Sequence, residues 1–111
     1  MRGGLASALL VGALVTALAT GCAHHTAGTT DSLAGSVQRG RALFVKTCAN
    51  CHGPTGVEGG MCPSLRGERR RKDLDATIVW IHYPQPPMPT LYPAPLTDAE
   101  VVDIASYVQT L

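Results

Sequence analysis

The amino-acid sequence predicts an all-α domain, and three segments with helical periodicity carry this prediction. Apolar or small residues recur at steps of three and four in the segments 36–48, 73–82 and 97–111. No segment combines strand-like alternation with a hairpin turn. Nine Lys and Arg face eight Asp and Glu among the 111 residues, so bulk charge does not indicate a nucleic-acid partner.

The N-terminal segment is typical of an export signal that ends before a modified cysteine. Arg2 supplies the positive charge, an uncharged apolar run covers residues 5–18, and small residues lead to Cys22. The segment 18–22, Leu-Ala-Thr-Gly-Cys, resembles a lipoprotein processing site. We therefore expect a signal peptide over residues 1–21 and acylation of Cys22. A single-span anchor and a soluble exported form are the alternatives, although a stable span needs about 20 apolar residues.

Residues 22–35 are expected to join the lipid to the domain. They are mostly small and polar and show no periodicity, which favours a flexible tether. The domain itself is expected to cover residues 36–111 and to lie on the periplasmic side of a bacterial membrane. Loss of Arg2 with the signal balances the acidic and basic residues of the mature chain.

The first helix is expected over residues 36–48, with Val37 and Phe44 on its apolar face. Gly40 lowers helix stability relative to alanine, so its presence indicates close approach of a second helix. We expect the last helix to lay Tyr107 over Gly40 and against Phe44.

Two further helices have recognisable ends. The segment 73–82 carries apolar residues on one face and must end near Tyr83, because Pro84 disfavours helix at the preceding residue. Thr97 and Glu100 form a capping-box pattern that starts the last helix.

The segment Cys48-Ala49-Asn50-Cys51-His52 carries the chemistry of the chain. Cys-x-x-Cys-His is the spacing of covalent haem attachment, in which two thiols add to the two vinyl groups of one porphyrin. The following imidazole is then placed to bind the iron. An exported chain is the right context, because bacterial haem attachment takes place outside the cytoplasm.

Two other classes of protein use similar residues. A thiol-disulfide enzyme has its Cys-x-x-Cys at the start of a helix after a strand, whereas here the motif closes a helix. A structural zinc module would use Cys48, Cys51, Cys62 and His82. With Cys22 assigned to lipid and two thiols to haem, Cys62 is expected to be a free thiol. Its alternatives are an intermolecular bridge or a redox-sensitive site.

From Ser36 to Leu111 the order of motifs resembles a class I cytochrome c. The motifs are an N-terminal helix with Gly and Phe, Cys-x-x-Cys-His, Pro-x-Leu-x-Gly, a Trp-bearing middle helix, Pro86-Pro87-Met88-Pro89 and an amphipathic last helix. The closing motifs are most similar to small single-haem domains, free or in membrane oxidases and dehydrogenases. The resemblance implies three to four helices packed around one covalent haem c, and electron transfer without catalysis of a substrate reaction.

Carried over by residue, the resemblance implies thioether links at Cys48 and Cys51, His52 as proximal ligand and Met88 as distal ligand. It also places the Pro63 carbonyl against the His52 ring N–H. The family pattern has small residues where this chain has Met61 and Cys62.

Some roles have alternatives. The alternatives to Met88 are His82 as distal ligand and an open or otherwise filled sixth site. Met61 follows His52 by only nine residues and is poorly placed to reach the opposite face. Trp80 either donates its indole N–H to a haem propionate or is an ordinary core aromatic.

The partners implied are redox proteins at the membrane surface, with no nucleic acid. The basic run Arg66, Arg69, Arg70, Arg71 and Lys72 is either a docking face for such a partner or a solvated loop neutralised by Glu68, Asp73 and Asp75.

Overall fold

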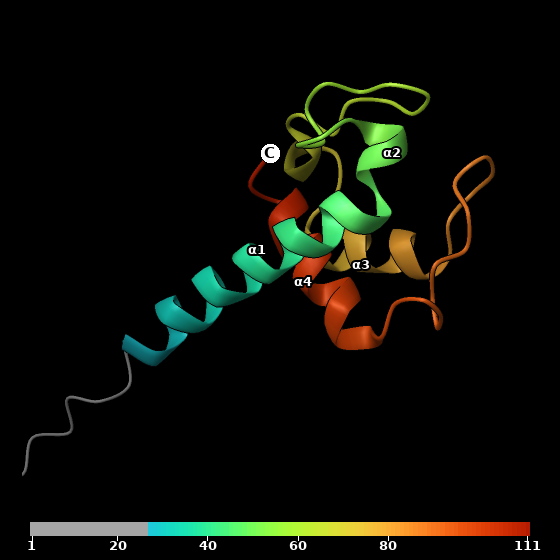
Figure 1. Cartoon of the computed structure of the whole chain (residues 1–111). Coiled ribbons are helices and arrows are strands. Elements are labelled where there is room, and N and C mark those ends of the chain that lie inside the picture. Colours follow the sequence, from blue (N-terminus) through green and yellow to red (C-terminus); the bar gives the residue numbers. More distant parts are fainter. Residues whose placement is uncertain (1–26) are drawn as a thin grey trace, which may run out of the picture.

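The structure is a computed structural model that describes residues 27–111. The described chain forms α1 (Ala27–Thr47), α2 (Ala49–His52), the 3-10 turn η1 (Glu68–Arg70), α3 (Leu74–His82) and α4 (Asp98–Val108) (Figure 1). These residues contain no strand, which confirms the all-α prediction. None of the helices described is both long and apolar enough to span a bilayer. The export signal and Cys22 lie outside the described residues.

The contact between α1 and α4 is the centre of the fold. A Cβ on Gly40 would lie 1.8 Å from the backbone oxygen of Asp103, so only glycine allows this approach. The expectation that Tyr107 covers Gly40 was therefore wrong: the α4 backbone itself fills that space. Tyr107 lies one turn further along α4 and packs edge-on against Phe44, with ring centroids 5.4 Å apart, as expected.

An ion pair joins the same two helices beside the core. Arg39 donates from Nε to Asp103 Oδ2 at 2.8 Å and from Nη2 to Oδ1 at 3.1 Å. Both oxygens of the Asp103 carboxylate therefore have a hydrogen-bond donor. Such partners are needed because the residue is only 9 % exposed to water. The buried apolar core comprises Phe44, Ile81, Leu96, Val101, Ile104, Ala105, Tyr107 and Val108.

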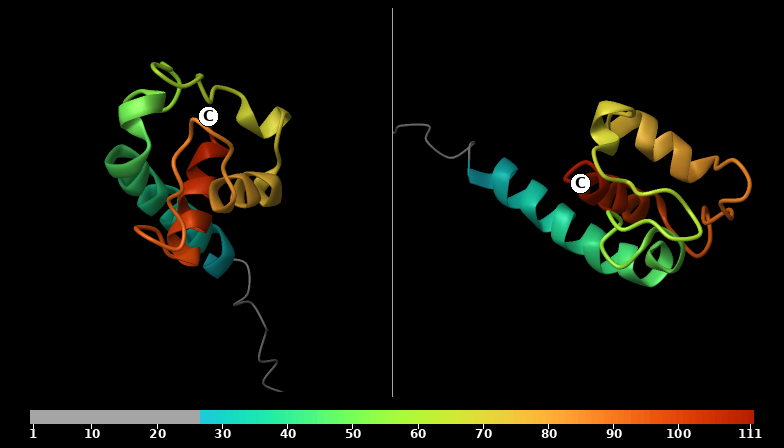
Figure 2. Two further views of the ribbon diagram at one scale, coloured as in Figure 1. Left: turned by 90° about the vertical axis from the view of Figure 1, so that its right-hand side faces the viewer. Right: turned by 90° about the horizontal axis from the view of Figure 1, so that it is seen from above.

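Helix α1 begins at Ala27, nine residues before the start expected at Ser36. Residues 27–35 are helical in place of the expected unstructured tether. Alanine and serine are compatible with helix, but the segment 27–35 shows no apolar periodicity from which a helix could be predicted. The first turns of α1 project beyond the rest of the fold (Figures 1 and 2).

The ends of α3 and α4 agree with the sequence patterns. The Asp73 carboxylate caps α3 by accepting from Ala76 N at 2.9 Å, and α3 ends at His82, two residues before Pro84. At α4 both bonds of the capping box are present, with Glu100 Oε2 accepting from Thr97 N at 2.9 Å.

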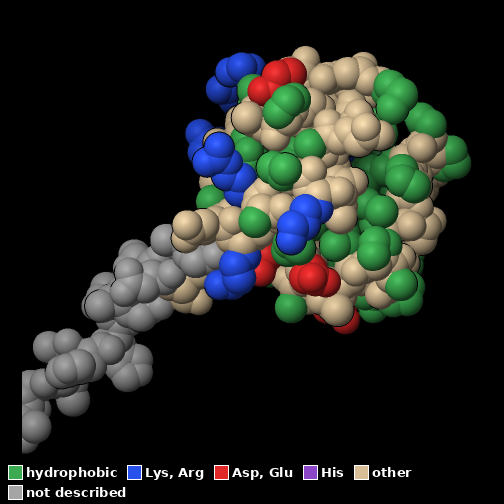
Figure 3. Space-filling model, in the orientation of Figure 1, with side chains coloured by type: hydrophobic (Ala, Val, Ile, Leu, Met, Phe, Trp, Pro, Cys, Tyr) green, Lys and Arg blue, Asp and Glu red, His purple; other side chains and the backbone are tan. Residues whose placement is uncertain are grey.

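Two loops complete the domain and are called here the proximal loop (53–67) and the proline loop (83–97). In Figure 1 the proximal loop lies at the top, after α2, and the proline loop lies at the right, between α3 and α4; Figure 2 gives two further views of both. In the view of Figure 3, hydrophobic side chains gather on the side of the molecule where the proline loop lies, whereas Lys and Arg gather on the opposite side.

Candidate functional site

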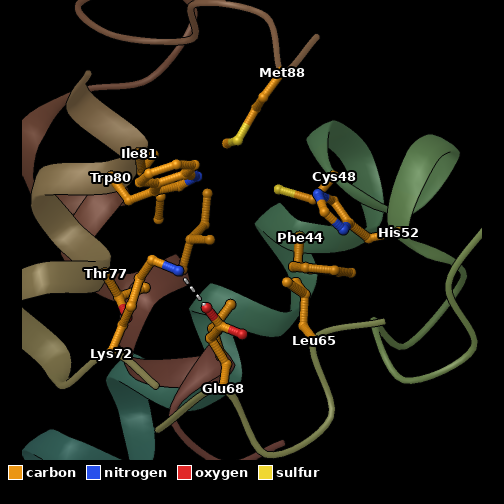
Figure 4. Close-up of a pocket in the computed structure, with 12 residues that line it drawn as sticks. Phe44, Cys48, His52, Leu65, Glu68, Lys72, Thr77, Trp80, Ile81 and Met88 are labelled. Atoms are coloured by element: carbon orange, nitrogen blue, oxygen red, sulfur yellow. Dashed lines mark hydrogen bonds and ion pairs between the residues drawn. The ribbon is translucent and has the colours of Figure 1, made fainter. Parts of the chain in front are cut away.

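A cavity lies between α2, α3 and the two loops. Three adjoining hollows make it up, and all three have His52 and Met88 in their walls. The largest has a volume of about 530 Å³, within the range of about 300–1,000 Å³ of ligand sites. Figure 4 shows Met88, His52 and Trp80 around the open centre, with Met88 at the top, His52 at the right and Trp80 at the left.

The two motif cysteines enter this cavity from one short stretch of chain. Helix α1 ends at Thr47, Cys48 forms the turn, and α2 carries Cys51 and His52. Both thiols line one hollow. Burial raises the pKa of the Cys48 thiol, and a hydrogen bond with Thr47 partly opposes that rise. The motif therefore presents two thiols and an imidazole to one apolar space.

The His52 ring is held by a single backbone acceptor. Its Nδ1 lies 2.8 Å from the carbonyl oxygen of Pro63, as the resemblance implied. Because a carbonyl only accepts, the proton is assigned to Nδ1, and the Nε2 lone pair is free to bind a metal. The acceptor also makes the imidazole a better donor.

The proximal loop is bonded directly to the motif that it covers. Gly59 N donates to His52 O at 3.1 Å, and Cys62 N donates to Cys51 O at 3.0 Å. At Gly56 the φ angle is +88°, and an added Cβ would lie 2.8 Å from Phe44 Cζ. The Tyr107 hydroxyl donates to Thr55 O at 2.8 Å. Pro63 is therefore placed by bonds to α2 and by contacts with the core.

Met88 approaches from the proline loop. Its backbone N–H donates to Gln85 O at 3.1 Å, and its partly buried side chain packs against the core. In Figure 4 the thioether points into the cavity from the top of the view, between Trp80 and His52. The two candidate ligands thus come from separate segments, α2 and the proline loop, that share one cavity.

The two alternative ligands, His82 and Met61, are less well placed than Met88. His82 Nε2 is at ion-pair distance, 3.2 Å, from Asp98 Oδ1, without hydrogen-bond alignment. Its ring lies 4.2 Å from that of Tyr92, and it is absent from the walls of the cavity. Met61 lines the largest hollow, but it belongs to the proximal loop and its side chain is 77 % exposed. In the part of the chain that the structure describes, no three His, Cys, Asp or Glu side chains are grouped to hold a metal ion, which removes support from the zinc alternative.

Trp80 and Lys72 form the polar end of the cavity. Trp80 is 41 % exposed, so it is not an ordinary core aromatic. Lys72 Nζ lies 4.8 Å from the centre of its ring, close enough for a cation–π contact. Indole and ammonium donors at one end of an apolar space suit a ligand with an apolar body and an anionic edge.

Glu68 is a site residue that sequence reasoning did not place in the cavity. It is only 7 % exposed, lines the cavity, and accepts from Lys72 Nζ at 2.9 Å and from Arg71 Nε at 2.9 Å. Burial raises its pKa, but the hydrogen bonds and charges of Lys72 and Arg71 outweigh burial and hold the pKa below its ordinary value. The spacing to residues 71 and 72 predicted the pairing, but nothing in the sequence indicated the burial.

The basic run is therefore partly neutralised. Glu68 pairs with Arg71 and Lys72, whereas Asp73, expected to help, caps α3 instead. Arg66, Arg69 and Arg70 are exposed.

The residues of the cavity fit a covalently attached haem. Two thiols stand beside an imidazole with a defined tautomer, and a thioether enters the same apolar space, which has cationic and indole donors at one end. This donor set combines a proximal His and a distal Met with two points of attachment.

The comparisons with known proteins agree with this chemistry. Residues 35–108 match the family described as cytochrome c oxidase, cbb3-type, subunit III. A cytochrome c-553-like protein of Synechocystis sp. is 38% identical over 81 residues, which cover 72% of this chain and 73% of that protein. No solved structure matches the chain significantly. The chain therefore belongs to the cbb3-type cytochrome c family of small class I c-type cytochromes, and is an electron carrier whose cofactor is a covalently bound c-type haem.

Proposed function

We propose that this cytochrome carries single electrons through one haem attached at Cys48 and Cys51, with His52 and Met88 as axial ligands. The observation that carries the proposal is the placement of His52, from α2, and Met88, from the proline loop, in the walls of the same cavity. The bond from His52 Nδ1 to Pro63 supports a proximal role, since it leaves Nε2 for the iron. The location of His82, outside the cavity walls and beside Asp98, favours Met88 as the distal ligand.

When bound, the haem supplies a one-electron redox couple, and the surrounding residues set its reduction potential. Two axial side chains leave no open position for a substrate. A thioether opposite histidine raises the reduction potential. Trp80 and Lys72 are proposed to receive the propionates, with Glu68 holding Lys72 in place.

Mass spectrometry and absorption spectroscopy test this proposal. The protein, produced with a haem-attachment system and then denatured, should retain the mass of one haem. The oxidised native protein should show the near-infrared sulfur-to-iron charge-transfer band of methionine ligation. An apo mass in all preparations would contradict haem attachment, and one haem without this band would contradict the ligand set alone.

The cellular location is proposed on sequence grounds. Residues 1–21 would act as signal peptide, and an acylated Cys22 would hold the domain on the periplasmic side of the membrane, near its redox partner proteins. The helical start of α1 at Ala27 leaves a short connection between lipid and domain. Cys22→Ser should move the protein from the membrane to the soluble fraction. Unchanged fractionation, with no lipid on the native N-terminal peptide, would contradict the anchor.

A role as subunit of a larger membrane oxidase or dehydrogenase is the second candidate. The description of the matching family, subunit III of a cbb3-type oxidase, favours it. Gentle solubilisation of native membranes followed by size separation distinguishes the two roles. A subunit co-migrates with a haem-containing complex, whereas a carrier migrates alone.

A further inference from the structure

An acidic side chain lies in the wall of the apolar cavity. Glu68 is only 7 % exposed and lines the two hollows that also contain Lys72 and Trp80. A buried carboxylate is costly unless it is paired and hydrogen-bonded. Its charge also repels the anionic edge of the ligand that the cavity fits. A role in binding that ligand therefore does not account for Glu68.

The carboxylate keeps its charge because two cations hold it. Lys72 Nζ donates to Glu68 Oε1 at 2.9 Å, the contact drawn in Figure 4, and Arg71 Nε donates to Oε2 at 2.9 Å. Burial raises the pKa of the Glu68 carboxyl, but the hydrogen bonds and charges of these two partners hold it below its ordinary value. The group is therefore a carboxylate at neutral pH.

The backbone fixes this carboxylate in the cavity wall. Glu68 N donates to Leu65 O at 3.0 Å, and Lys72 N donates to Glu68 O at 2.9 Å. From α4, Gln109 Nε2 donates to Lys72 O at 3.1 Å and to Thr77 Oγ1 at 2.9 Å. The segment 68–72 is thus bonded to itself, to α3 and to α4, and Glu68 has a defined place beside the cavity.

Water screens the two cations more than the carboxylate. The side chain of Arg71 is 55 % exposed and that of Lys72 30 %, against 9 % for Glu68. A charge that faces water is weakened by the solvent and by salt, whereas a buried charge acts through the protein at a lower effective dielectric constant. Within the cavity, the negative charge of Glu68 is therefore only partly cancelled.

Such a charge acts on a redox couple in a definite direction. Oxidation adds one positive charge to a haem iron, so a nearby carboxylate favours the oxidised form and lowers the reduction potential. Two unit charges about 10 Å apart, at an effective dielectric constant of about 20, change an equilibrium constant by roughly tenfold or more.

We propose that Glu68, besides holding Lys72, lowers the reduction potential of this cytochrome through its own charge, in opposition to the Met88 thioether. The inference rests on the proposed haem attachment and ligands. Glu68 acts as a tuning residue that touches neither proposed iron ligand. The reduced protein therefore gives up its electron more readily than a carrier with the same ligands and no such carboxylate.

Reduction potentials of the haem-loaded, full-length protein test the proposal. Glu68→Gln removes the charge and keeps an oxygen that can accept from Lys72. Its potential should rise by about 59 mV, which is a tenfold change in the equilibrium constant of a one-electron couple. The matched control is Asp75→Asn, because Asp75 is exposed on the first turn of α3 and absent from the cavity walls. Its constant should change by less than about twofold, and not at all in about 1 M salt.

The direction of the change separates charge from damage. A loosened cavity admits water, which favours the charged, oxidised iron and lowers the potential, so damage does not raise it. Glu68→Asp keeps the charge and should return the constant to within about threefold of the native value. The sulfur-to-iron band should be present in both variants. An unchanged or lower potential in Glu68→Gln, with this band intact, would show that Glu68 only holds Lys72 and would overturn the proposal.

Lys72→Gln tests the same charges with the opposite sign, and decides the question if Glu68→Gln accumulates no holo-protein. Loss of this cation leaves Glu68 paired with Arg71 alone, so the potential should fall; an unchanged or higher potential overturns the proposal. The native protein is measured first. If it lacks covalent haem or the sulfur-to-iron band, the proposed function fails, whereas a normal native protein without these shifts in its variants contradicts the role of Glu68 alone.

Discussion

The two sides of the cavity are built by different means. On the proximal side, backbone bonds tie the loop 53–67 to α2, and the Tyr107 hydroxyl joins it to α4. On the distal side, the proline loop has two backbone bonds between its own residues, from Met88 N to Gln85 O and from Leu96 N to Leu91 O. Six of the eight prolines of the chain lie in that loop. Hydrogen bonds hold one side, and backbone stiffness and packing hold the other.

This difference suits the two proposed ligands. The imidazole belongs to the segment that also holds both thiols, so its placement and haem attachment depend on the same structure. The thioether is a weak ligand that must be held near the iron by its loop. Damage to the proximal side should therefore cost the cofactor, whereas damage to the distal side should change only its electronic properties.

The largest effect is expected from Cys51→Ser. Loss of one thioether from the proximal motif should strongly reduce or abolish accumulation of holo-protein, because the remaining thiol holds the porphyrin at one point only. Haem-stained denaturing gels of cells with a haem-attachment system measure this. Met88→Ala is the distal comparison and should keep its covalent haem. Equal loss in both variants would remove the distinction between the two sides.

A smaller effect is expected from Gly56→Ala, which tests how closely the proximal loop fits the core. Alanine at a φ of +88° is strained, and its Cβ would lie 2.8 Å from Phe44 Cζ. We expect the free energy of unfolding to fall by about 2–3 kcal/mol.

Gly67→Ala is the matched control, since φ is +70° there with no atom within 4 Å of the added Cβ. It should cost about 1 kcal/mol. Denaturant titration of the two holo-proteins measures the difference. Equal losses of unfolding free energy in the two variants would show that the proximal loop at Gly56 is not in close contact with Phe44.

The smallest effect is expected from the pH dependence of the Glu58 contact. Hydrogen bonds from the Thr55 side chain and backbone lower the pKa of the exposed Glu58 carboxyl. Its stabilisation of the proximal loop is therefore fully present above the unfolded pKa, about 4.3, and is lost as the pH falls through the lower folded value. The stability difference between the native protein and Glu58→Gln should be constant near neutrality and shrink in acid. A difference that grew in acid would contradict this sign.

Much of the fold could be predicted from the sequence, because its signals are local. The caps at Asp73 and Thr97 and the stop before Pro84 depend on neighbouring residues, and the structure agrees with them. The helical start at Ala27 could not be predicted, because residues 27–35 show no apolar periodicity. The partner of Gly40 was wrongly identified, since a close approach is visible in the sequence but the atom that approaches is not.

The site was predictable in its chemistry but not in its surroundings. The spacing 48–52 indicated the haem motif, and the resemblance supplied the roles of Pro63 and Met88. The burial of Glu68 and the contact between Cys62 and Cys51 depend on how the proximal loop folds back over α2. The course of this loop cannot be predicted from sequence periodicity.

The central claim is that His52 and Met88 bind one iron from opposite sides, and the reduction potential of two variants tests it most directly. Met88→Ala should keep its covalent haem, lose the sulfur-to-iron charge-transfer band and show a lower reduction potential, because water or a stronger donor replaces the thioether. His82→Ala should leave the band and the potential unchanged. If His82→Ala instead made the iron high-spin while Met88→Ala kept the native spectrum and potential, the ligation would be bis-histidine and the account of this cavity would be wrong.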